Sequence, residues 1–166
     1  MRSLIFLACT FALAAALAAT AGAAGTANGT LSVAEGRGVV VIELRGSVIG
    51  RLGNGMLRVT DLTPRDRFGE IVFGRELDEE PRGPRTVLYR GQGIRFRMLG
   101  GAYRIWVRGR GIDLAAVGRG AVVLDGDPRA LEGTGLYSVT GVDCGIDALL
   151  CTPLPDEPAR LTIGSP

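Results

Sequence analysis

Arginine side chains alternate with apolar ones between residues 94 and 108, and this stretch is the best suited to bind a ligand. It runs IRFRMLGGAYRIWVR, and every charged residue in it is an arginine. Arginines together with an exposed aromatic ring suit carboxylate or phosphate groups on sugar chains. We therefore take five side chains as candidate ligand-binding residues: Arg95, Arg97, Arg104, Trp106 and Arg108.

The alternation in this stretch has the period of a half-buried strand and predicts one β-hairpin. Gly100 and Gly101 tolerate positive φ and would form the tight turn. On one face this register pairs apolar residues only: Met98 with Tyr103, Phe96 with Ile105, and Ile94 with Val107. The other face would carry Arg97 opposite Arg104, a pair of like charges that is unfavourable unless an anion lies between them. It would also bring Arg95 beside Trp106 in a cation–π contact.

Catalytic side chains are scarce in this chain. Its 166 residues include no His and no Lys, which excludes Ser-His, Cys-His and Ser-Lys pairs, Schiff-base lysines and His-ligated metal ions. Paired carboxylates can hydrolyse a glycosidic bond, but strand-end aspartates ordinarily make turn hydrogen bonds. The aspartates near predicted strand ends are Asp61, Asp113, Asp125 and Asp127, and no spacing singles out a pair. We predict no enzymatic activity, metal ion or cofactor, with a carboxylate-dependent glycoside hydrolase as the alternative.

The first 23 residues have the pattern of a signal peptide. Arg2 precedes an apolar run over residues 4–17, and small residues at 19, 21 and 23 form small-x-small cleavage sites. We predict a signal helix, cleavage after residue 23, and export to the cell envelope or the medium. No later stretch is long and apolar enough to span a bilayer, so we expect no membrane contact after cleavage.

Two cysteines, Cys144 and Cys151, remain in the predicted mature chain. An even number of cysteines in an exported protein favours a disulfide. The closed loop is short, so the bond would stabilise the fold by roughly 2–3 kcal/mol. Redox chemistry of the CxxC type is not supported because six residues separate the pair.

Short β-branched segments separated by glycine-rich turns predict an all-β fold. About ten short strands, mostly antiparallel, would form a single-domain sandwich or barrel, with a parallel β-helix as the alternative. We place the β-domain at residues 24–126 and a loop-rich, disulfide-pinned tail packing on it at residues 127–166. An internal repeat relates Ile42–Gly46 to Ile105–Gly109, which fits two related halves of the β structure.

Charge is segregated along the chain. Residues 85–120 contain eight Arg and one Asp, whereas residues 125–157 contain seven acidic residues and one Arg. Two interpretations stay open. The acidic tail folds over the basic face and neutralises it, or the basic face binds an anionic polymer outside the membrane.

These observations predict an exported, non-enzymatic structural or binding module of the bacterial cell envelope. The alternative within the binding class is a protein that uses the five candidate residues to hold an anionic polysaccharide or cell-wall polymer. We expect no nucleic-acid partner. The sequence leaves the oligomeric state open.

Overall fold

The computed structural model describes residues 29–65 and 69–164. The predicted signal peptide lies outside these residues. The all-β prediction is confirmed, since strands make up most of the described chain and one 3-10 turn, η1 (Ala148–Leu150), is its single helical element. Within these residues no helix has the length and apolar character needed to cross a membrane.

One antiparallel sheet contains most of the chain, with its strands in the order β2-β3-β1-β4-β7; beside this path β5 pairs with β1, and β6 pairs with β5. The strands are β1 (Gly29–Asp61), β2 (Glu70–Pro81), β3 (Thr86–Met98), β4 (Ala102–Gly126), β5 (Leu136–Ser138), β6 (Thr152–Pro153) and β7 (Ala159–Ile163). Every pairing among the described strands is antiparallel, which excludes the parallel β-helix. The sheet has seven strands, not about ten, because β1 and β4 continue through the glycine turns that we expected to end them.

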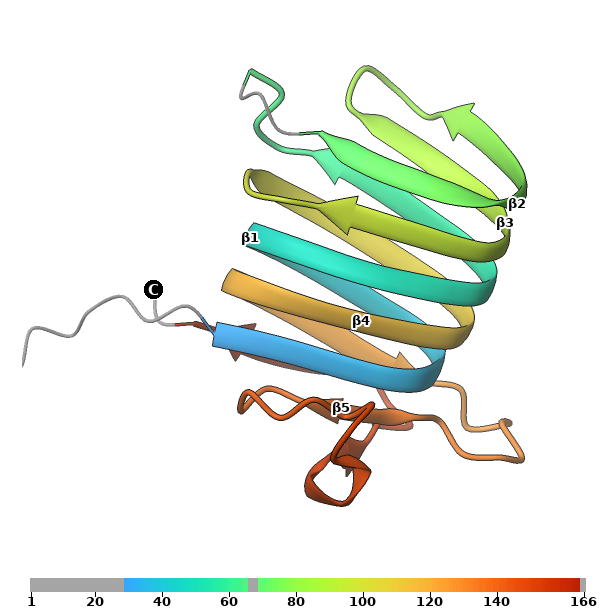
Figure 1. Ribbon diagram of the computed structural model, residues 1–166, viewed down its shortest axis with the longest axis vertical. Helices are drawn as coiled ribbons and strands as arrows, with labels where there is room; N and C mark the ends of the chain where they lie inside the picture. Colours follow the sequence, from blue (N-terminus) through green and yellow to red (C-terminus); the bar gives the residue numbers. More distant parts are fainter. Residues whose placement is uncertain (1–28, 66–68, 165–166) are drawn as a thin grey trace, which may run out of the picture.

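The long strands bend sharply, so the sheet folds back over itself into two layers (Figure 1). As a result β1 and β4 pair with each other twice, and residues 38–45 of β1 lie between residues 102–109 and 119–126 of β4. The front layer contains residues 29–35, 46–52, 70–75, 93–98 and 112–118. The rear layer contains residues 38–45, 54–61, 78–81, 86–92, 102–109 and 119–126.

Glycines allow neighbouring strands to bend at the same place. Gly-x-Gly triplets occupy residues 36–38, 53–55, 91–93 and 109–111, where the strands pass from one layer to the other (Figure 1). Gly55 and Gly109 lie opposite each other with φ of +151° and +155°. A Cβ on Gly55 would approach the Arg108 carbonyl oxygen to 2.1 Å. We call this edge of the sheet the glycine bend.

Side chains that alternate along each strand point between the layers and form one core. It includes Ile42, Leu57, Ile94, Ile105 and Ile112, all completely buried. The remaining side chains of each strand point outward, as the period-2 pattern requires. The fold therefore has two outer surfaces, which we call the front face and the rear face after the layers that carry them.

The predicted hairpin between residues 94 and 107 is wrong. Met98 lies opposite Val48, and Tyr103 lies opposite Leu44 and Asp61, because β1 runs between β3 and β4. Gly100 and Gly101 do have positive φ, +80° and +77°. They connect the front layer to the rear layer instead of joining two paired strands.

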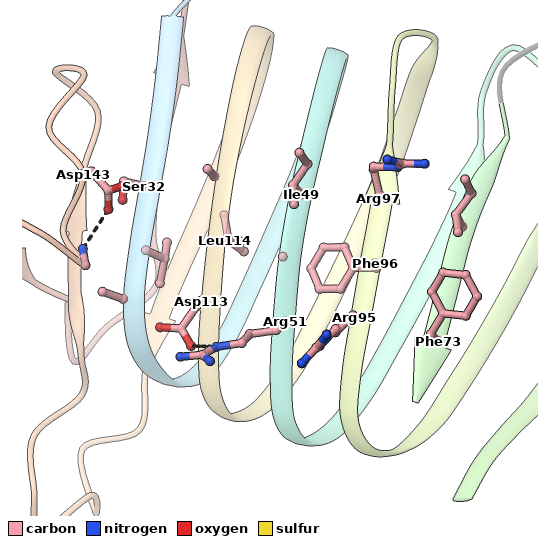
Figure 2. Close-up of a pocket in the computed structure, with 16 residues that line it drawn as sticks. Ser32, Ile49, Arg51, Phe73, Arg95, Phe96, Arg97, Asp113, Leu114 and Asp143 are labelled. Carbon is pink, nitrogen blue, oxygen red and sulfur yellow. Dashed lines mark hydrogen bonds and ion pairs between the residues drawn. The ribbon is translucent and has the colours of Figure 1, made fainter. Parts of the chain in front are cut away.

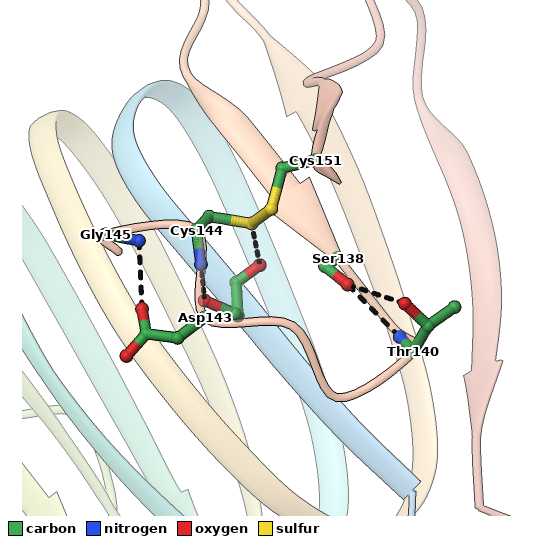
Figure 3. The surroundings of a disulfide bond; sticks show 7 residues. Ser138, Thr140, Asp143, Cys144, Gly145 and Cys151 are labelled. Atoms are coloured by element: carbon green, nitrogen blue, oxygen red, sulfur yellow. Dashed lines mark hydrogen bonds between the residues drawn. A yellow bond between two sulfur atoms is a disulfide. The ribbon is translucent and has the colours of Figure 1, made fainter. Parts of the chain in front are cut away.

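Residues after Gly126 complete the sheet as well as forming loops. β7 pairs with β4, and β5 pairs with β1. Cys144 and Cys151 form the predicted disulfide, and the Cys144 backbone N–H donates a hydrogen bond of 3.1 Å to Ser32 Oγ of β1 (Figure 3). The tail is thus fastened to the front layer at the edge formed by β1.

Candidate functional site

The structure divides the five predicted ligand-binding residues between two surfaces. Arg95 and Arg97 of β3 lie on the front face, whereas Arg104, Trp106 and Arg108 of β4 lie on the rear face. The alternation correctly identified outward-pointing side chains. It failed to show that β3 and β4 belong to different layers, so the single basic face is wrong.

On the rear face, two arginines, Arg104 and Arg58, have partners within the fold. Arg104 donates hydrogen bonds to Glu43 Oε2 from Nε at 3.0 Å and from Nη2 at 2.8 Å. The Trp106 ring contacts Arg58, whose guanidinium carbon lies 5.1 Å from the ring centroid. Both predicted contacts, Arg97 with Arg104 and Arg95 with Trp106, are therefore wrong, and Arg104 and Trp106 have other partners.

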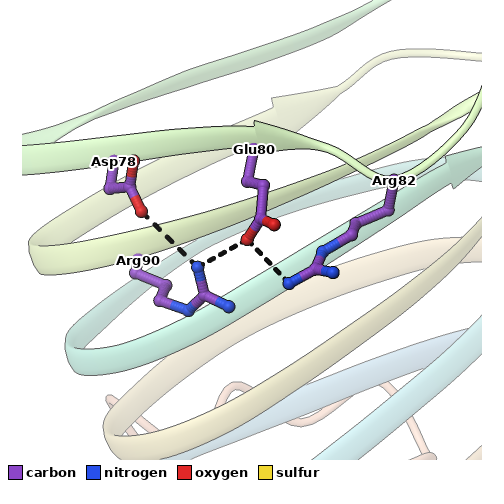
Figure 4. A network of polar contacts seen from close by, with 4 residues as sticks. All are labelled: Asp78, Glu80, Arg82 and Arg90. Atoms are coloured by element: carbon purple, nitrogen blue, oxygen red, sulfur yellow. Dashed lines mark hydrogen bonds and ion pairs between the residues drawn. The ribbon is translucent and has the colours of Figure 1, made fainter.

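A network of ion pairs lies at the end of the rear face that β2 forms (Figure 4). Arg90 Nη1 donates to Glu80 Oε2 at 2.8 Å and to Asp78 Oδ2 at 3.4 Å, and Arg82 Nη2 donates to Glu80 Oε2 at 2.8 Å. The hydrogen bond from Arg90 is the main cause of a lowered pKa for the Glu80 carboxyl. Glu80 raises the pKa of Arg90 in return. This network stabilises the charged forms of its own members.

The front face contains a groove that runs across the strands, with a volume of about 620 Å³ (Figure 2). We call it the front groove. The tail closes one end at Asp143, and Ile71 and Phe73 of β2 close the other. Gly50 lies in its floor, where a Cβ would come within 2.5 Å of the Phe96 ring. The absence of a side chain there lets that ring pack beneath the groove.

Strand register arranges the groove side chains in two rows. The row nearer the glycine bend consists, in order, of Asp113, Arg51, Arg95 and Phe73. The second row consists, in order, of Ala115, Ile49, Arg97 and Ile71. The groove thus places basic and apolar groups side by side over four neighbouring strands, and its apolar members are unusually accessible, with Phe73 67% and Ile49 53% exposed.

Of the arginines in the groove, only Arg51 has a carboxylate partner among the described residues. Asp113 Oδ2 accepts a hydrogen bond of 2.7 Å from Arg51 Nε, and Asp113 Oδ1 accepts one of 2.8 Å from the Glu35 backbone N–H. The hydrogen bond to Asp113 raises the pKa of Arg51. Arg95 and Arg97 make no ion pair within residues 29–65 and 69–164. Their positive charges therefore face the groove without an acidic partner from the described part of the chain.

The acidic tail reaches the groove without neutralising these arginines. Asp143 lines one end, but its carboxylate accepts the Gly145 backbone N–H at 2.9 Å. In the described part of the chain, the ion pair that the tail makes with the sheet joins Glu132 to Arg37. Neutralisation of the five predicted residues by the tail is therefore absent from the described contacts.

Sequence reasoning missed four groove residues: Ile49, Arg51, Ile71 and Phe73. One signal was present in the run Ile71-Val72-Phe73, because consecutive strand residues point to opposite sides. Two of the three apolar side chains had to share one face. Arg51 had no comparable signal, because its neighbours in the groove come from other strands.

Comparison with known proteins gives no match to a protein-family model, to a curated protein or to a solved structure. The site must therefore be interpreted from its own chemistry. In the part of the chain that the structure describes, no group of three His, Cys, Asp or Glu residues could hold a metal ion. The front groove remains the candidate, as a surface that offers cations and apolar groups side by side.

Proposed function

We propose that this chain is a non-enzymatic binding module that holds an anionic extracellular polymer in the front groove. The observation that carries the proposal is the position of Arg95 and Arg97, which make no ion pair with any described residue and lie beside exposed Phe73 and Ile49. Guanidinium groups bind carboxylates and phosphates in a planar, two-pronged geometry. Exposed apolar groups next to them favour a ligand that also has an apolar face, as a sugar ring does.

We also propose export to the bacterial cell envelope after cleavage of residues 1–23. The disulfide between Cys144 and Cys151 supports this location, because disulfides persist in oxidising compartments outside the cytosol. We class the fold as a flattened sandwich made from a single sheet. In this scheme, residues 24–126 form the body of the domain, and the tail at residues 127–166 completes its edges.

The groove can be tested with an oligogalacturonate, a short chain of sugar carboxylates, in isothermal titration calorimetry. Replacing Arg95 and Arg97 together by Gln should weaken binding at least about tenfold, the equivalent of about 1.4 kcal/mol. The matched control replaces Arg119 and Arg160, which are exposed and lie at the far edge of the rear layer, by Gln. Binding that is unchanged in the groove variant, or equally weakened in both variants, would contradict the proposal.

A second candidate, a glycoside hydrolase, is favoured by one observation. Asp113 and Asp143 both line the front groove, and paired carboxylates catalyse this reaction. Against it, Asp113 already accepts hydrogen bonds from Arg51 and from the Glu35 backbone, which gives it a structural role. Release of new reducing ends from polygalacturonate, abolished by Asp113→Asn, would establish the hydrolase in place of the binding module.

A further inference from the structure

The glycine bend displays one row of polar side chains, one from each neighbouring strand segment. The members lie opposite one another in the order Arg37, Arg110, Asn54, Gln92 and Arg75. Four of them are the middle residues of Gly-x-Gly triplets. At the fifth, Arg75, the following Glu76 adopts the positive φ, +50°, that glycine provides elsewhere. We call this row the bend row.

The bend row faces outward. Four of its members are exposed, and Arg37 is partly covered through its ion pair with Glu132. Side chains on adjacent strands are about 4.8 Å apart, so the row extends over about 19 Å. Figure 1 shows these bends stacked along one edge of the sheet. The residues at the bend thus form a regularly spaced row of hydrogen-bond donors.

Positive charge gathers on both sides of this line. A hollow on the front side contains Arg51, Arg75 and Arg95, and it shares Arg51 and Arg95 with the front groove. A hollow on the rear side contains Arg108, Arg110 and Arg129. The ion pairs found in these hollows are Arg51 with Asp113 and Arg37 with Glu132. Five arginines are left without an acidic partner among the described residues: Arg75, Arg95, Arg108, Arg110 and Arg129.

We propose that the bend row is a second binding site, which takes a linear polyanion laid across the strands. A repeating chain can place successive anionic groups against successive strands, whereas a small anion can use only one or two positions. The inference rests on the proposed function for the class of ligand. It adds that the ligand is long and linear, and that the five bend-row residues, none of which lines the front groove, also bind it.

Chain length and salt give the bend row a distinctive signature. When one binding event joins many weak contacts, affinity rises with ligand length until the ligand spans the site. Each cation that neutralises a charge on a polyanion also releases a counterion, so log affinity falls linearly with log salt concentration. A site with several arginines in line should show both effects.

The test compares a galacturonate disaccharide with a long polygalacturonate. In the bend variant, Arg75→Gln is combined with Arg110→Gln, two exposed residues with no described ion pair. Affinity for the long chain should fall about tenfold, and the salt slope should become shallower by roughly 1–2. Affinity for the disaccharide should not change. The control pair Arg119→Gln with Arg160→Gln should leave both ligands unaffected.

Three results would overturn the proposal that the bend row binds a polyanion. One is a long chain that binds the unaltered protein no more tightly than the disaccharide does. Another is an equal loss in the bend and control variants, which would show dependence on net charge alone. The third is a bend variant that binds the long chain as tightly as the unaltered protein does. The front groove is judged separately by the Arg95 and Arg97 variant with the disaccharide. If that variant loses the disaccharide while the bend variant keeps the long chain, the groove stands and the bend row fails.

Discussion

Arg58 and Arg104 of the rear face and Arg95 and Arg97 of the front face are used in opposite ways. On the rear face, Arg104 is bound to Glu43, and Arg58 lies against Trp106. On the front face, Arg95 and Arg97 have no described acidic partner, and Phe73 beside them is mostly exposed. Both faces come from one alternating pattern. The difference is created entirely by which strands become neighbours.

The comparison shows how a binding surface can be distinguished from a stabilising one in a chain rich in arginine. A surface ion pair contributes only about 0–1 kcal/mol to folding, so neither set of arginines holds the fold together. What separates the faces is availability. An arginine whose donors already bind a carboxylate has little to offer a ligand, whereas Arg95 and Arg97 keep theirs.

Titration of the core between the faces should give the largest effect. Burial, helped by Glu70 and Glu79, raises the pKa of Tyr89 to about 12 from 10.0. The folded state therefore favours the neutral phenol, and this stability is complete below pH 10 and lost as pH rises toward 12. The loss should reach roughly 2–3 kcal/mol.

Urea unfolding and tyrosinate absorbance, recorded below pH 10 and near pH 12, would measure this loss of stability from the titration of Tyr89. Tyr89→Phe should remove this part of the pH dependence. If the variant keeps the full alkaline loss, Tyr89 is not the source of the effect.

The next largest effect is a difference in stability between substitutions of the aromatic residues on the two faces. Trp106 is partly buried and contacts Arg58, so Trp106→Ala should lower the free energy of unfolding by about 2 kcal/mol. Phe73 is 67% exposed, so Phe73→Ala should change the free energy of unfolding by less than about 0.5 kcal/mol. Phe73→Ala should nevertheless weaken oligogalacturonate binding. Equal losses of stability for Trp106→Ala and Phe73→Ala in urea unfolding would contradict this difference between the faces.

Paired neutralisation of arginines gives the third comparison. Arg58→Gln with Arg104→Gln should cost about 1 kcal/mol of stability and leave oligogalacturonate affinity unchanged. Arg95→Gln with Arg97→Gln should do the reverse, with stability unchanged and affinity reduced about tenfold. Calorimetric titration and thermal melting of both variants would measure this. A rear-face variant that binds as weakly as the front-face variant would assign the ligand to both faces.

The smallest effect concerns the network at the β2 end of the rear face. Because the pKa of Glu80 is lowered from 4.5, its carboxylate form stabilises the fold. That contribution is present above pH 4.5 and is lost as pH falls through the lower, folded-state value. Glu80→Gln should therefore flatten the fall in melting temperature below pH 4.5. Glu157→Gln, at an exposed residue of the tail, is the control and should leave the fall unchanged.

The sequence predicted what depends on local periodicity. Alternation identified the strands and their inward residues, such as Ile94, Ile105 and Val107, which are all fully buried. The disulfide followed from cysteine number and spacing. Positive φ at Gly100 and Gly101 followed from the turn chemistry of glycine.

Strand neighbours could not be predicted in the same way. A period of two indicates which side of a strand faces the core. It does not indicate which other strand lies alongside. The alternating pattern fits equally well whether Met98 lies opposite Tyr103 or opposite Val48, because both are apolar. The glycine triplets were ambiguous for a similar reason, because the same residues serve a turn that ends a strand or a bend that continues it.

The double pairing of β1 with β4 constrains when this protein can fold. Residues 38–45 of β1 have β4 on both sides, and even the nearest paired residues, Arg45 and Ala102, are 57 positions apart (102 − 45). A chain made from its N-terminus holds the first part of β1 without either neighbour until β4 has followed. Folds dominated by such distant pairings form slowly, in milliseconds to seconds. If the chain is exported as we propose, that delay keeps it extended while it is threaded across the membrane, and the sheet closes only on the other side.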